Sequence, residues 1–225
     1  MLRMDLCYNN CNVKVICSHA GLTVGEDGAS AQCLEDLALM RVLPNMVVIC
    51  PVDTIEAQKA TRAIAAAKGP MYLRTSRAPL PVLTKESDPF KIGKANVLRE
   101  GKDVTIFGCG TMVSEALQAA EILGKEKISA RVVNMHTIKP IDEDMIIRCA
   151  KETGTIVSAE EHQMNGGLGS AVAEVLVRHC PVAMEMVAVR DTFGESGTPQ
   201  ELLKAYHLKD VDIVQAAKKA VKRKR

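Results

Sequence analysis

Apolar segments of strand length alternate with amphipathic segments of helical length along almost the whole chain. We expect strands at residues 13–17, 46–50, 71–74, 103–108, 131–135, 155–159 and 184–189. The helical patterns between them cover residues 33–43, 53–68, 112–123, 142–151, 168–178, 199–205 and 211–221. Alternation at this spacing predicts an α/β fold, in which mostly parallel sheets are covered by helices.

A stretch without periodicity separates the two halves and contains Pro79, Pro81 and Pro89. It predicts a linker between a first domain at residues 1–84 and a second at residues 92–225. The second domain should hold a mostly parallel, five-stranded open sheet. The first looks truncated, because it has three strands and no regular element is expected before residue 13. Since a parallel sheet needs cover on both faces, this half either packs on the second or is completed by another chain.

Composition excludes several classes of function. A formal net charge of +2, three Phe, three Tyr and no Trp argue against a nucleic-acid partner. No apolar run reaches the roughly 18 residues that a membrane span needs, so we expect no membrane partner either. Eight cysteines without a C-x-x-C pair, and no signal-like start, predict a reduced cytoplasmic protein without a metal site.

The candidate functional residues gather in the turn at residues 19–28, between the first strand and the first helix. Ligands of open α/β sheets bind at this end of the strands. Gly25 and Gly28 permit backbone conformations closed to other residues. His19 can meet an anion or a hydroxyl group, and Asp27 can accept hydrogen bonds from hydroxyl groups. On spacing alone, a tight turn with solvated acids and a surface histidine is the alternative.

Several motifs resemble transketolase, in order and at the family's spacing. The later part of its pyrimidine-binding domain is similar to residues 18–28 (SHAGLTVGEDG), 34–38 (LEDLA), 44–46 (PNM), 48–51 (VICP) and 72–77 (YLRTSR). Its C-terminal domain is similar to residues 137–142 (TIKPID), 160–162 (EEH) and 166–170 (GGLGS). The match covers essentially the whole chain, which therefore resembles the C-terminal portion of a transketolase, as in C-terminal subunits of split forms.

The resemblance implies a thiamine-diphosphate enzyme of the pentose phosphate pathway that moves a two-carbon ketol unit between sugar phosphates. Thiamine diphosphate and magnesium would be bound mainly by residues outside this chain, which would carry no catalytic residue. By position, His19 would face the sugar-phosphate end of the substrate, and Asp27 would contact a hydroxyl near the reacting carbon. Arg77 would bind the terminal phosphate. The implied partner is a diphosphate-binding domain or subunit, in a homo- or hetero-oligomer.

This sequence also departs from the family pattern. It lacks the glutamate that protonates the pyrimidine ring and the aromatic residues that hold that ring. Residue 31 is Ala31, where many members have His and some have Gln. We therefore expect the isolated chain to be inactive. The alternatives are a non-catalytic assembly or interaction module, or part of a 1-deoxy-xylulose-phosphate synthase or of an enzyme like the β subunit of 2-oxo-acid dehydrogenases.

Other polar or glycine-rich motifs favour structural roles. Residues 108–110 (GCG) lack the third glycine of a dinucleotide site, because Val113 occupies its place. Residues 160–162 (EEH) follow an apolar run and predict a polar loop or a subunit contact rather than a metal site. Arg74 and Arg77 are three residues apart at a strand exit. Solvated or ion-paired surface arginines are the plain interpretation of both, and the resemblance favours Arg77 over Arg74 for binding.

Overall fold

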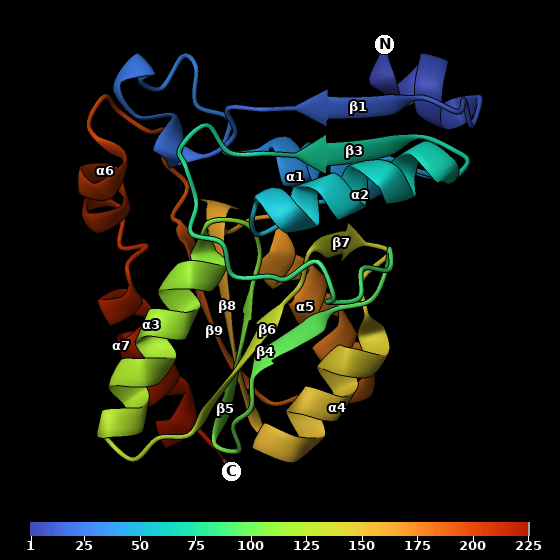
Figure 1. The fold of residues 1–225 in the computed structure, drawn as a ribbon. Helices are drawn as coiled ribbons and strands as arrows, with labels where there is room; N and C mark the ends of the chain where they lie inside the picture. Colours follow the sequence, from blue (N-terminus) through green and yellow to red (C-terminus); the bar gives the residue numbers. More distant parts are fainter. Residues whose placement is uncertain (225) are drawn as a thin grey trace.

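Two sheets organise residues 1–224, the part of the chain that this computed structural model describes (Figure 1). The first sheet has four strands in the order β1-β3-β2-β7. Its parallel members are β1 (Lys14–Cys17), β3 (Met71–Arg74) and β2 (Val47–Ile49). The fourth strand, β7 (Thr137–Lys139), runs antiparallel to β2. The sheet therefore takes its last strand from a distant part of the chain, where we expected no strand.

The second sheet has five strands in the order β4-β6-β5-β8-β9. The strands are β4 (Asn96–Arg99), β5 (Val104–Gly108), β6 (Ala130–Asn134), β8 (Thr155–Gln163) and β9 (Ala183–Val189). All neighbours are parallel except β4, which pairs antiparallel with β6 at the edge. This arrangement confirms the mostly parallel five-stranded sheet, although β4 was not expected from the sequence.

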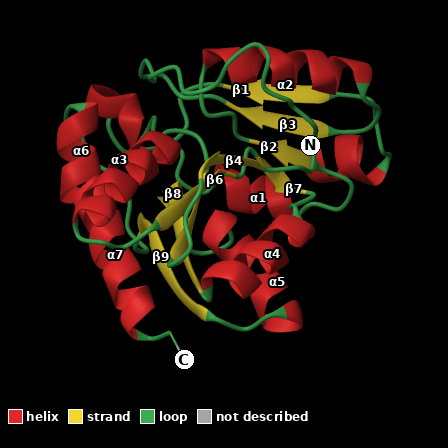
Figure 2. Ribbon diagram, turned by 60° about the horizontal axis from the view of Figure 1, so that its bottom comes forward, coloured by secondary structure: helices red, strands yellow, loops and turns green. Residues whose placement is uncertain are grey.

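Helices cover both faces of the second sheet (Figure 2). On one side lie α3 (Met112–Lys125) and α7 (Asp210–Lys222), and on the other lie α4 (Glu143–Thr153) and α5 (Leu168–His179). Alternation along β5 divides the core, because Ile106 joins the cluster on the α3 and α7 side and Phe107 joins the cluster on the α4 and α5 side. The short α6 (Pro199–Ala205) packs against the turn that follows β1.

The first sheet is covered by α2 (Thr54–Ala66) on one face and by α1 (Asp36–Val42) on the other. Asp53 caps α2 by accepting the Glu56 amide at 2.8 Å. On the α1 face, Val48 and Tyr72 belong to the same apolar cluster as Phe107 of the second sheet. The small half therefore packs closely on the second half. A short π-helical segment, Leu2–Tyr8, occupies the start, where no regular element was expected.

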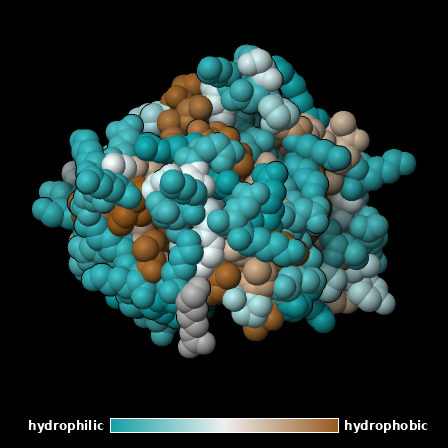
Figure 3. All heavy atoms as spheres, turned by 90° about the horizontal axis from the view of Figure 1, so that it is seen from below, coloured by the Kyte–Doolittle hydropathy of each residue, from teal (hydrophilic) through white to brown (hydrophobic). Residues whose placement is uncertain are grey.

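The outer edge of the first sheet is formed by β1, which has no second strand partner within residues 1–224. Ile16 on this strand is 54% exposed, and Val13 just before it is 43% exposed. An unpaired edge with exposed apolar side chains is a surface that another chain can cover. By contrast, the face around the C-terminus is mostly hydrophilic, with small hydrophobic islands (Figure 3). No helix in the described part of the chain is both long and apolar enough to cross a membrane.

Candidate functional site at the carboxyl ends of the first sheet

The carboxyl ends of β1, β2 and β3 point in one direction, and the loops that follow them carry the predicted site residues. The 19–28 turn follows β1 and contains a 3-10 segment, Leu22–Asp27, with a kink at Gly25. Gly25 and Gly28 have φ values of +83° and +77°, in the region that glycine tolerates best. The local backbone thus requires the glycines that the sequence places there.

Asp27 and Arg77 come together at this end of the sheet. Arg77 Nη1 lies 3.1 Å from Asp27 Oδ2 and donates a hydrogen bond to the Val24 carbonyl oxygen at 2.6 Å. Their side chains are 41% and 48% exposed, so the ion pair contributes little to stability. The guanidinium is held by the turn and remains open to solvent. It can therefore receive an anionic group through its remaining donors.

His19 is exposed and has an unusual backbone conformation. Its φ is +64°, a left-handed value that is uncommon for a residue with a side chain. Its Nδ1 lies 2.8 Å from the Ser18 hydroxyl. No hydrogen bond or ion pair in residues 1–224 joins His19 to Asp27 or Arg77. The structure thus brings two of the three predicted residues into contact and places His19 on the same turn, separately.

Arg74 corrects the expectation of a surface arginine, because it is buried. Its Nε lies 3.2 Å from Asp36 Oδ2, and its Nη2 donates to the Glu161 carbonyl oxygen at 2.8 Å. The Tyr72 hydroxyl donates to the same Asp36 oxygen at 2.8 Å. Burial opposes the charge of Arg74, but the negative groups around it, the Asp36 carboxylate foremost, together raise the Arg74 pKa. Arg74 therefore links the two sheets beneath the candidate site.

The expectation of a polar loop at residues 160–162 was also wrong, because all three side chains are buried within β8. Glu160 accepts the amides of Leu168 and Gly169 at 2.7 and 2.8 Å and so caps the start of α5. Burial raises the pKa of Glu160 to about 7. Sequence patterns predict that consecutive polar residues are exposed, so they do not reveal that these three are buried. The Gly-Gly pair at 166–167 is the one local sign of the close packing here.

The other two residues of this group reach into the first half of the chain. His162 Nε2 accepts the Ala38 amide of α1 at 3.2 Å, and burial lowers the pKa of His162, which favours the neutral acceptor. Glu161 accepts the amide of Thr23 through Oε1 and the Thr23 hydroxyl through Oε2 at 3.2 Å. Three adjacent residues of one strand therefore hold three different elements, one of which is the 19–28 turn.

Gln32 is a further residue that the sequence did not single out. Its Nε2 donates to the carbonyl oxygens of Leu22 and Gly25, both at 3.3 Å, and of Glu195 at 3.0 Å. Its Oε1 is buried and has no hydrogen-bond partner in the described structure. The amide thus ties the turn to the segment before α6, next to the exposed Ala31.

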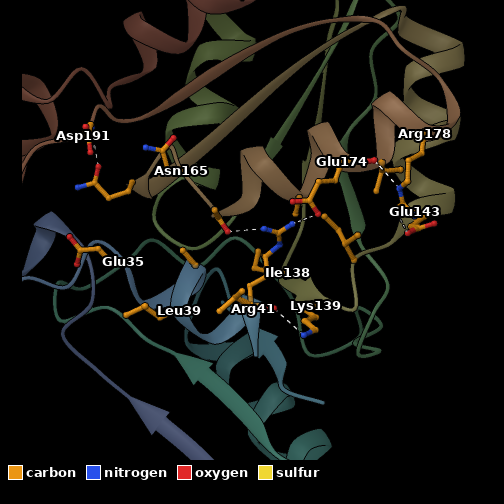
Figure 4. A pocket seen from close by; sticks show the side chains of 17 residues that line it. Glu35, Leu39, Arg41, Ile138, Lys139, Glu143, Asn165, Glu174, Arg178 and Asp191 are labelled. Carbon is orange, nitrogen blue, oxygen red and sulfur yellow. Dashed lines mark hydrogen bonds and ion pairs between the residues drawn. The ribbon is translucent and has the colours of Figure 1, made fainter. Parts of the chain in front are cut away.

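A large hollow lies elsewhere, between α1, α4 and α5, with a volume of about 850 Å³ (Figure 4). Most of its cationic groups already have partners within the groove. Arg41 pairs with Glu174 and Arg178 with Glu143, and Lys139 donates to the carbonyl oxygens of Arg41 and Leu43 at 2.9 and 2.6 Å. Because both of its arginines are already paired with carboxylates, this groove is a weaker candidate for binding a small anion than the Asp27–Arg77 pair.

Metal binding by this chain has little support from its donors. Among residues 1–224, no group of three or more His, Cys, Asp or Glu side chains is arranged to hold a metal ion. All eight cysteines are free thiols. The described residues therefore offer no carboxylate, imidazole or thiolate cluster for a divalent metal with its bound diphosphate.

The fold and the turn define a class: an α/β protein with two mainly parallel sheets, whose candidate ligand site lies at the carboxyl ends of parallel strands. Comparison with protein families then gives the family. The transketolase pyrimidine-binding domain matches residues 1–82, and the transketolase C-terminal domain matches residues 93–213. The chain belongs to the transketolase family, whose members generally use thiamine diphosphate and a divalent metal.

Two of the similar proteins are longer than this chain and are single parts of a transketolase. The 6-deoxy-6-sulfo-D-fructose transketolase subunit SqwH of Clostridium sp. (strain MSTE9) is 43% identical, over 98% of this chain and 69% of the relative. A putative transketolase C-terminal section of Methanocaldococcus jannaschii is also 43% identical, over 99% and 71%. Transketolase of Rattus norvegicus is 41% identical over 92% of this chain, which spans 34% of that enzyme.

A solved structure described as "Split gene transketolase, inactive beta4 tetramer" has a TM-score of 0.94 and 47% identity. It covers all of this chain, which spans 72% of that structure. The chain is therefore the C-terminal part of a transketolase, as in split forms of the enzyme. These findings confirm the resemblance and the fold class predicted from the sequence, whereas the boundaries 1–84 and 92–225 stay predictions.

Proposed function

We propose that this chain supplies substrate contacts to a thiamine-diphosphate-dependent transketolase that moves a two-carbon ketol unit between sugar phosphates. The observation that carries the proposal is the solvent-facing Arg77 guanidinium, held against Asp27 and the Val24 carbonyl at the ligand end of the sheet. In this assignment the Arg77 fork binds the terminal anion of the sugar. Asp27 accepts a hydrogen bond from a substrate hydroxyl, and His19 lies toward the sugar-phosphate end.

The terminal anion is phosphate in this proposal, as in the sugars of the pentose phosphate pathway. The relative named for 6-deoxy-6-sulfo-D-fructose introduces a sulfonate as the competing group. Both anions suit a planar guanidinium, but a phosphate dianion gains more from one cation than a sulfonate monoanion does. Comparing a phosphorylated with a sulfonated sugar therefore tests the substrate class.

The cofactor supplies the carbon nucleophile, and we propose that another chain holds its diphosphate and magnesium. The absence of a suitable donor group among residues 1–224 supports this division. The free edge of β1, with Ile16 exposed, offers a surface for such a chain, in a hetero- or homo-oligomer. The proposal places the assembly in the cytoplasm, where eight free thiols stay reduced, and expects the isolated chain to be inactive.

A non-catalytic assembly module is the second candidate. It is favoured by Ala31, which lacks the polar side chain of many family members just after the turn, and by the inactive tetramer described for the similar structure. This alternative predicts a chain that binds a partner and adds no turnover. Activity that returns when the chain is mixed with the complementing transketolase chain would exclude it.

The test uses the reconstituted enzyme, with xylulose 5-phosphate as donor and ribose 5-phosphate as acceptor. Arg77→Ala should raise the KM for phosphorylated sugars about tenfold or more, because one charge-assisted contact is lost. An unphosphorylated ketol donor should be affected far less. Arg62→Ala, at an exposed arginine on α2, is the matched control and should leave KM unchanged. Equal KM values for wild type and Arg77→Ala would overturn the role of Arg77.

A further inference from the structure

The buried carboxylate of Glu161 comes from the second half of the molecule and binds the turn in the first half. It lies on β8 of the second sheet and is 3% exposed. Both of its oxygens bind Thr23, which lies within the 3-10 segment that ends at Asp27. The Thr111 side chain also favours the charged form of this carboxylate and holds its pKa down. All of these donors approach from the loops at the ligand end of the two sheets.

The turn is shaped around this carboxylate. Gly21 has a φ of +87°, and a Cβ on Gly21 would overlap the Glu161 carboxylate. A residue with a side chain would therefore be strained in its backbone and would also displace Glu161. On the other side, Gln32 holds the Leu22 and Gly25 carbonyls. The turn is fixed at Thr23 by the second half of the chain and at its carbonyls by Gln32.

Stability alone does not explain a carboxylate at position 161. Burial raises the pKa of Glu161, while Arg74 and the Thr23 donors act in the opposite direction. A buried carboxylate of this kind gives less net stability than a well-packed apolar side chain would. Its neighbour Glu160 caps α5 and His162 contacts α1, so neither touches the turn.

We propose that Glu161 is a positioning residue, through which the C-terminal sheet sets the conformation of the 19–28 turn and hence the place of Asp27 beside Arg77. The inference rests on the proposed function, because it gives the turn a substrate to bind. Glu161 does not touch the substrate. It holds Thr23 four residues before Asp27, and loss of this anchor lets the Asp27 carboxylate leave the geometry that the substrate requires.

Two measurements test the proposal. In the first, amide hydrogen exchange of the chain itself is followed peptide by peptide in Glu161→Leu and in the matched control Glu160→Leu. Exchange should become faster in the turn only for Glu161→Leu, and at the start of α5 only for Glu160→Leu. In the second, the reconstituted enzyme should show a KM about tenfold higher for Glu161→Leu, with a smaller change in kcat, as for the loss of one hydrogen bond to a charged group.

Conservative variants keep the test meaningful if a Leu variant fails to fold. Glu161→Gln can still accept the Thr23 amide and bond its hydroxyl, so its KM should stay within about twofold of the wild-type value. Thr23→Val removes only the hydroxyl contact and should raise KM about threefold, as expected for one neutral hydrogen bond.

Unchanged exchange in the turn of Glu161→Leu, or equal effects of the Glu160 and Glu161 variants on KM, would overturn the proposal. Faster exchange with an unchanged KM would likewise refute the positioning role. Failure of the proposed function is seen separately, as absent ketol transfer by the wild-type assembly. The exchange measurement then still decides whether Glu161 holds the turn.

Discussion

Replacing Arg74 by Met should destabilise the chain severely, because it leaves buried partners without their cation. In Arg74→Met the Asp36 carboxylate keeps only the Tyr72 hydroxyl as a donor to Oδ2, and its Oδ1 already has no partner. The carbonyl oxygen of Glu161 also loses the hydrogen bond that Arg74 donates. The Asp36 side chain is 6% exposed, so water cannot replace what is removed.

The expected loss follows from these contacts. Breaking a buried ion pair by removing one partner costs about 3–5 kcal/mol, and this range includes most of the effect of the lost carbonyl contact because the two share one side chain. We therefore expect the free energy of unfolding to fall by about 4 kcal/mol, a large part of a typical total of about 5–15 kcal/mol. Adding Asp36→Asn removes the stranded charge but keeps an acceptor for Tyr72. The double variant should be about 2 kcal/mol more stable than the sum of the single effects.

Urea unfolding followed by far-ultraviolet circular dichroism measures these differences, provided that the slope with denaturant stays constant. The exposed pair of Arg77 and Asp27 is the control, and Arg77→Met should cost no more than about 1 kcal/mol. A loss below about 1 kcal/mol in Arg74→Met, or additive effects in the double variant, would refute the reasoning.

Three further predictions concern pH and backbone. Burial raises the pKa of Glu56 to about 7. Between about pH 5 and 7 the native protein therefore keeps a proton that the unfolded chain releases, so the free energy of unfolding falls as the pH rises. Glu56→Gln should flatten this pH dependence in urea titrations. Burial lowers the pKa of His136 to about 4. Between about pH 4 and 6.5 the unfolded chain therefore binds a proton that the native protein does not, so the free energy of unfolding rises with pH. His136→Gln should lose this rise in the same titrations. Gly21→Ala should cost about 2–4 kcal/mol in thermal unfolding; an unchanged Tm would contradict the strain at φ +87°.

Elements with local signals could be predicted well from the sequence. The start of α2 follows from Asp53, which caps the Glu56 amide three residues later, although the Glu56 carboxylate accepts the Val52 amide instead of returning to Asp53. The strand at 71–74 has the expected bounds. By contrast, β4 and β7 are three or four residues long and gain their stability from distant partners, so no local pattern marks them.

The candidate site shows the same division. The glycines of the turn follow from local backbone requirements, but the different environments of Arg74 and Arg77 do not. Arg74 ends β3 and Arg77 follows three residues later, so the local sequence does not distinguish them. Only the tertiary structure brings Asp36 of α1 against Arg74, where the ion pair is buried. The contact between Glu161 and Thr23 could not be predicted from a local pattern either, because the two residues are 138 positions apart in the chain.

The pairing of β2 with β7 limits how this polypeptide can be divided. A break in the proline-containing linker would give a first piece whose β2 edge is bare and a second piece with a stray strand. During synthesis, β2 must wait for a partner that leaves the ribosome roughly 90 residues later, and such late closure slows folding and prolongs exposure of the edge. The shared sheet therefore makes the two halves one structural unit, although two family models match them separately.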